Sequence, residues 1–146
     1  MKQCEFPNFQ FGQIFNLVNK KFRKIDDRCL SKYNLTHFHA MYLGNLYING
    51  EMNMSELTSV IGVDKANTTR VIRDLLSKGY IEKVGESNRK YDIRLTPSGI
   101  EVAKDFSSTI NKVIKESFKN FTDDEKKEFR RLLAKFFEGV GNVGNI

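Results

Sequence analysis

The chain has 146 residues, of which 40% are hydrophobic and 29% charged, and its formal net charge at pH 7 is +6. This composition excludes an intrinsically disordered chain, and we predict a single domain over residues 1–146 with an anionic partner. No apolar run reaches the length of a membrane span, and the two cysteines, Cys4 and Cys29, form no CxxC pair that would hold a disulfide framework or zinc. We therefore expect a cytoplasmic protein without a membrane partner.

Two helices are predicted in the first third of the chain. Apolar residues recur every three or four positions from Phe11 to Leu30, which is typical of an amphipathic helix. A second helix begins at Thr36, and its apolar residues are so dense that we expect it to be largely buried. The Asn49-Gly50 pair ends it. The opposite face of the first helix is basic, with Lys20, Lys21, Arg23 and Lys24.

Two short helices separated by a glycine follow. Asn53 and Glu56 have the spacing of a capping box, which predicts the start of a short helix that ends at Gly62. Asp64 can cap a second helix over residues 65–78, which Gly79 closes. Two short helices joined by a tight turn indicate a helix-turn-helix.

A β-hairpin and two further helices complete the chain. Residues 80–84 and 91–95 alternate in character around the polar segment 85–90, which predicts two strands with a polar tip. Thr96 and Pro97 supply a cap and a first-turn proline for a long helix to about Phe118. Thr122 and Glu125 open the last helix. The fold class predicted is therefore mainly α with a small β-hairpin wing, a winged helix-turn-helix.

The helix over residues 65–78 has two distinct faces. At 100° per residue, its apolar side chains fall on one face and small or basic side chains on the other. A slim polar face with arginines suits the DNA major groove, where Arg can read guanine and Asn can read adenine. Which side chains would contact bases and which would contact phosphates stays open. The predicted DNA contacts are Lys65, Asn67, Thr69, Arg70 and Arg73.

The hairpin tip supplies a second group of predicted DNA contacts, which are Asn88, Arg89 and Lys90. Arg89 could lie in the adjacent minor groove, where the negative potential attracts a guanidinium. Residues 51–96 hold eight Lys and Arg against seven Asp and Glu, so the net charge of this segment is only +1. DNA binding would thus require acidic side chains that point inward or away, or a contribution from the basic face of the first helix.

The sequence resembles the MarR family of transcriptional regulators. The resemblance rests on residues 65–70 and 75–81, a charged wing, and the segment Arg94 to Gly99, and it extends from Phe11 to Phe137. The family's wing usually carries an Asp-x-Arg element, whereas this chain has Ser87-Asn88-Arg89, which weakens the expected support for the wing arginine. The resemblance implies a DNA-binding lobe over residues 36–96 and a homodimer made by helices over residues 9–31 and 97–138.

The resemblance also implies a ligand-responsive repressor of a pseudo-palindromic operator, with a small-molecule effector whose binding residues are unknown. Phe15, His39 and Tyr42 could line an effector cleft, although core packing is the simpler interpretation of each. The predicted dimer surface is apolar and includes Phe6, Phe9, Phe11, Phe129, Leu132, Leu133, Phe136 and Phe137.

No catalytic motif is found, so we expect neither an enzyme nor a cofactor. The only two histidines, His37 and His39, are two positions apart and face different ways on a helix, which argues against a metal site. The GxGxxG match at residues 139–144 lacks a helix to follow it. The alternative function is a winged-helix module for protein–protein interaction without DNA binding. RNA binding is disfavoured, because we find no exposed aromatic pairs of the kind that stack bases.

Overall fold

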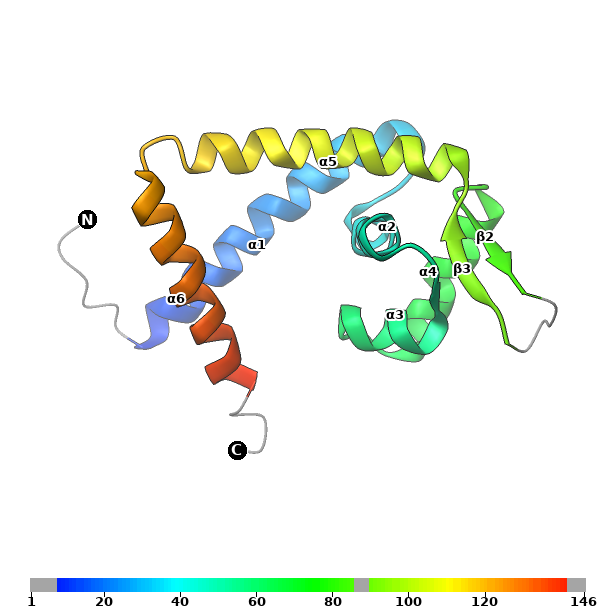
Figure 1. The fold of residues 1–146 in the computed structure, drawn as a ribbon, viewed down its shortest axis with the longest axis horizontal. Coiled ribbons are helices and arrows are strands. Elements are labelled where there is room, and N and C mark those ends of the chain that lie inside the picture. The colour runs from blue at the N-terminus through cyan, green and yellow to red at the C-terminus, as the bar shows by residue number, and fades with distance from the viewer. Residues whose placement is uncertain (1–7, 86–89, 142–146) are drawn as a thin grey trace. The chain divides into compact units, whose positions relative to one another are not determined.

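The computed structural model describes residues 8–85 and 90–141 (Figure 1). The chain forms two compact units, residues 1–109 and 110–146. The predicted fold class is confirmed, because helices dominate and the strands form one small antiparallel sheet. In the part of the chain that is described, no helix is long and apolar enough to cross a membrane.

The helices that precede the hairpin are α1 (Asn8–Leu30), the short 3-10 helix η1 (Ser31–Tyr33), α2 (His37–Asn49), α3 (Met54–Ile61) and α4 (Lys65–Ser77). Capping residues mark the starts of α2, α3 and α4. The predicted capping box is confirmed, since the Glu56 N–H donates to Asn53 Oδ1 at 2.9 Å and the Asn53 N–H donates to Glu56 Oε2 at 2.8 Å. Gly62, predicted to end α3, has the left-handed conformation (φ 71°) that is typical of a helix C-terminus.

The sheet has three strands, one more than predicted. The hairpin consists of β2 (Ile81–Val84) and β3 (Asp92–Leu95), and β1 (Met52–Asn53) pairs antiparallel with the other edge of β3. Met52 lies opposite Ile93 in this pairing. A strand of two residues is too short to show alternation, so the sequence pattern gives no sign of it.

A single core fills the first unit, and α5 (Pro97–Ser117) contributes to it. Val102 and Ala103 of α5 are buried together with residues of α2, α3, α4 and the sheet. The start of α5 lies so close to the turn between α4 and β2 that a Cβ on Gly99 would stand 1.9 Å from the Tyr80 carbonyl oxygen. The fully buried side chains with the largest volumes are Tyr42, Leu30, Leu43, Leu57, Leu75, Ile93, Val102 and Thr68.

The prediction that α2 is largely buried is wrong for one of its faces. Tyr42, Leu43 and Leu46 lie in the core, but Phe38 is 53% exposed and Ile48 81% exposed. The α2 sequence is apolar nearly all round, whereas only one side of the helix meets the core, so density of apolar residues overstated its burial. Cys29, near the end of α1, is half-buried.

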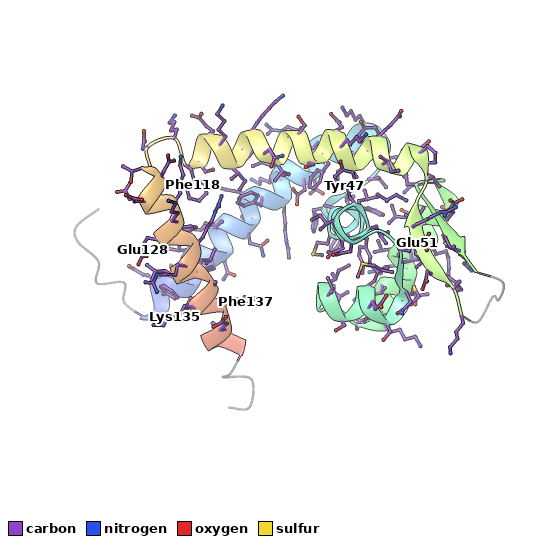
Figure 2. All side chains as sticks on the ribbon, viewed as in Figure 1. Tyr47, Glu51, Phe118, Glu128, Lys135 and Phe137 are labelled. Carbon is purple, nitrogen blue, oxygen red and sulfur yellow. The ribbon has the colours of Figure 1, made fainter. Side chains whose placement is uncertain are left out.

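The second unit contains the end of α5 and α6 (Asp123–Gly141). Phe118, Phe121 and Phe129 pack edge to face, with ring centroids 5.0 to 6.2 Å apart, and close the turn between the helices. The predicted start is confirmed, because the Thr122 N–H donates to Glu125 Oε2 at 2.7 Å. No described residue of α6 is buried, and Phe137 projects from this helix (Figure 2).

Candidate nucleic-acid interface

Helix α4 is held in the first unit by a cap at its start and an apolar face along its length. The Asn67 N–H donates to Asp64 Oδ1 at 2.8 Å, and this hydrogen bond lowers the pKa of the Asp64 carboxyl. Val71, Ile72 and Leu75 are buried, as the helical periodicity predicts. Thr68 is fully buried, and its hydroxyl oxygen accepts a hydrogen bond from Tyr42 at 3.3 Å. The orientation of the opposite face is thereby fixed.

That opposite face carries the side chains predicted to contact DNA. Lys65, Asn67, Arg70 and Arg73 are exposed, and Thr69 is half-buried. The Thr69 hydroxyl donates to the Lys65 carbonyl at 2.8 Å, which leaves its oxygen free to accept. An open groove of about 700 Å³ borders Arg70 and Arg73 and is lined on the α2 side by Phe38. Both arginines therefore have room to change rotamer.

Asn67 joins two of its neighbours in a short chain of hydrogen bonds. Its amide donates to the Asp64 carboxylate, and its Oδ1 accepts from Arg70 Nη2 at 2.5 Å. The carboxylate thus orients the amide, and the amide orients the guanidinium. In the free protein the polar groups best suited to base edges are occupied by one another.

His39 connects α4 to the start of α2. Its Nδ1 accepts a hydrogen bond from the Thr36 N–H at 3.0 Å, and its Nε2 donates to Asp74 Oδ2 at 2.8 Å. Asp74 also pairs with Lys78, and the hydrogen bonds from Lys78 and then His39 lower the pKa of the Asp74 carboxyl. Sequence reasoning missed this connection, because Asp74 lies 35 residues from His39.

Arg94 on β3 pairs with acidic side chains on β2 and on the segment before β1. Its Nε donates to Glu82 Oε1 at 2.7 Å and its Nη1 to Glu51 Oε1 at 3.2 Å, and both carboxylates raise the pKa of the guanidinium. Glu51, which is labelled in Figure 2, lies just before β1. Glu56, Asp64 and Asp74 are engaged in contacts within the lobe as well. Most of the acidic residues that offset the basic charge of this region are therefore already paired or capping a helix.

The wing is described only at its base. Lys90 is exposed there, and the Lys83 ammonium lies 4.2 Å from the centroid of the Tyr91 ring. Asn88 and Arg89, the other two predicted contacts of the wing, lie outside the described residues.

Comparison with known proteins agrees with this geometry. The family model described as "MarR family" matches residues 34–89, from the segment before α2 to the wing. The HTH-type transcriptional regulator BilQ of Clostridioides difficile is 35% identical over 136 residues, which cover 88% of this chain and 90% of that protein. The chain belongs to the MarR family. The resemblance noted in the sequence is thus confirmed, and members of this family are transcriptional regulators rather than enzymes.

Solved MarR-family structures have the same fold. The structure titled MarR Protein from Peptoclostridium difficile has a TM-score of 0.82 and 27% identity, covering 97% of this chain and 92% of that one. The MepR–DNA complex of Staphylococcus aureus has a TM-score of 0.80 at 18% identity, covering 92% of this chain and 99% of that one. At that identity, the likeness to MepR establishes the fold alone.

Proposed function

We propose that this MarR-family regulator binds a pseudo-palindromic DNA operator as a homodimer, with α4 of each protomer in the major groove. The observation that carries the proposal is the exposed face of α4, which presents Asn67, Arg70 and Arg73 on a helix anchored on its other side to a fixed core. The MepR–DNA complex, which has the same fold, lends support from outside the chain. The lobe over residues 36–96 would contain the DNA-binding surface.

Individual roles follow from side-chain chemistry. Arg70 and Asn67 have the donor and acceptor groups that base edges recognise, and Lys65 and Thr69 suit phosphates near the start of α4. Arg73 can contact either a base edge or a phosphate, and both roles stay open for it. In the wing, Asn88, Arg89 and Lys90 would follow the minor groove beside the site.

The dimer surface is assigned to the terminal helices, residues 9–31 and 97–138. Leu132, Leu133 and Phe136 of α6 are between 39% and 49% exposed, and an apolar stripe of this kind is typical of obligate dimer interfaces. On α1, Phe11 and Phe15 are exposed in the same way. Phe6 and the side chain of Phe9 lie outside the described residues. A two-fold dimer would set its α4 helices about 34 Å apart, one turn of DNA.

Regulation by a small molecule belongs to the same proposal. The protein acts as a repressor, and an effector releases it from DNA by preferring a conformer in which the two α4 helices are wrongly spaced. Equal affinity for both conformers would leave the equilibrium unchanged.

The test is fluorescence anisotropy with duplex DNA selected by the wild-type protein from a random-sequence library. Arg70→Ala/Arg73→Ala is expected to lower affinity on the order of 100-fold and to reduce the salt dependence of binding, because each lost phosphate contact removes about 0.9 from the log–log slope. Lys119→Ala/Lys127→Ala, which removes the same charge from the second unit, is the matched control.

Two outcomes would contradict the proposal. Unchanged affinity in the arginine variant would remove α4 from the interface. Failure of the wild-type protein to enrich any duplex, even at low salt, would favour the protein–protein interaction module instead.

A further inference from the structure

Two separate contacts join α5 to the DNA-binding lobe. The first lies at the start of the helix, where the Thr96 hydroxyl donates to the Gly79 carbonyl at 2.6 Å and the Thr96 N–H donates to the Tyr80 carbonyl at 3.1 Å. Gly99 packs directly on the Tyr80 carbonyl, and any side chain at this position would collide with it. The first turn of α5 is therefore fixed to the turn between α4 and β2.

The second contact is made by Asp105, six residues after Gly99 on α5, and it reaches η1. Asp105 Oδ2 accepts a hydrogen bond from the Tyr33 hydroxyl at 2.8 Å and pairs with Lys32 Nζ at 2.7 Å. The hydrogen bond to Asp105 raises the pKa of Tyr33, as expected for a phenol that donates to a carboxylate. The Tyr80 hydroxyl donates to the Tyr33 carbonyl at 3.2 Å, and the two tyrosine rings pack edge to face.

These contacts meet at the place where both predicted dimer helices join the lobe. The 3-10 helix η1 connects α1 to α2, and α5 continues from the first unit into the second. A helix attached at one point can pivot, whereas attachment at Gly99 and again at Asp105, about 9 Å along the helix axis, fixes its direction.

We propose that the contacts of Asp105 with Tyr33 and Lys32 set the direction in which α5 leaves the lobe, and thereby the spacing of the two α4 helices in the dimer. The inference rests on the proposed function, because spacing has a meaning only for a dimer on DNA. Tyr33, Lys32 and Asp105 are positioning residues, since they act through α5 and contact no base.

The ion pair between Lys32 and Asp105 is expected to position α5 rather than to stabilise the fold. The Lys32 and Asp105 side chains are 60% and 41% exposed, and exposed ion pairs contribute little to the free energy of unfolding. Replacing Asp105 by alanine, a strong helix former, should thus leave the protein folded while releasing α5 from η1.

The first measurement is the distance between two spin labels in the free dimer. Ser77→Cys on α4, in a background with Cys4→Ser and Cys29→Ser, supplies one label per protomer for pulsed electron paramagnetic resonance. The reference protein is expected to give one narrow distribution, which Asp105→Ala broadens or shifts by several ångströms. Tyr33→Phe removes one hydrogen bond and is expected to have a smaller effect in the same direction. Glu116→Ala breaks an exposed ion pair on the same helix and is the matched control.

The second measurement compares half-site spacings in duplexes selected from a random-sequence library. The wild-type protein is expected to enrich one spacing, and Asp105→Ala to lower the affinity ratio between that spacing and its one-base-pair neighbours at least threefold. Unchanged distance distributions and spacing preference in a folded Asp105→Ala protein would overturn the inference. If the wild-type protein gives no measurable distance between labels, as a monomer would, and enriches no DNA, the proposed function itself would be refuted.

Discussion

Helices α4 and α6 are both amphipathic, but they differ in how deeply their apolar side chains are buried. Both repeat apolar residues every three or four positions, over 13 residues in α4 and 19 in α6. Four residues of α4 are buried, whereas none of α6 is. Apolar side chains of α4 are thus buried within their own unit, whereas Leu132 and Leu133 of α6 stay partly exposed. An amphipathic pattern identifies the face that packs, but not the surface against which it packs.

The largest effect is expected where α4 meets the core. Leu75 is fully buried, so Leu75→Ala should reduce the free energy of unfolding by about 3 kcal/mol through lost transfer energy and a cavity. Urea unfolding measures this change. Val60→Ala, at a position 57% exposed, is expected to change stability by less than about 0.5 kcal/mol. Equal losses in the two variants would contradict the contrast between buried and exposed apolar residues.

On α6, a change of charge should act on association instead of on the fold of one protomer. Leu133→Asp places a carboxylate on the exposed apolar stripe, and burying it in a dimer should weaken association about 100-fold or more. Light scattering across a dilution series reports this shift toward monomer. Lys127→Asp, on the polar side of α6, is the control. A Leu133→Asp protein as dimeric as the wild type would show that α6 is not the interface.

A smaller effect is expected from the polar pair beneath α4. Thr68→Val keeps the volume but leaves the buried Tyr42 hydroxyl without its acceptor, so it should cost about 1 kcal/mol. Tyr42→Phe/Thr68→Val removes both partners and is expected to cost less than the sum of the single changes, as measured by thermal unfolding. Strict additivity would show that the two hydroxyls do not interact.

The smallest effect concerns the partly exposed connection between α2 and α4. The pKa of Asp74 is lowered in the folded protein, so its contribution is present above the ordinary value of 3.8 and is lost as pH falls through the lowered value. Asp74→Asn should therefore be less stable than wild type by under about 1 kcal/mol at pH 7, with the gap closing below pH 4. Urea unfolding between pH 7 and pH 3 tests this, with Glu101→Gln as the control. A gap that widens in acid would reverse the sign of the argument.

Sequence reasoning succeeded where the determinants are local. The capping pairs Asn53 with Glu56 and Thr122 with Glu125 involve residues three positions apart, and the inward face of α4 follows from its own periodicity. The same periodicity correctly placed Arg70 and Arg73 on the exposed face.

It failed where the partner is distant in the chain. Strand β1 exists because Met52 pairs with Ile93 on the edge of β3, far along the chain, and two residues carry no pattern of their own. The polar contact of His39 could not be predicted, because its partner Asp74 is on another helix. The exposed face of α2 shows the related difficulty that apolar density does not tell how many sides of a helix meet the core. The DNA-contact assignments on α4 and the wing stay predictions.

The contact beneath Gly99 also has a consequence for how this sequence can evolve. Its backbone conformation would suit any amino acid, yet the Tyr80 carbonyl occupies the space of a Cβ. In a library randomised at this codon, functional clones should return almost only glycine, whereas the exposed neighbour Ser98 should vary freely. Position 99 is thus closed to substitution because another part of the backbone occupies the space, and only a coordinated change in the turn around Tyr80 could open it.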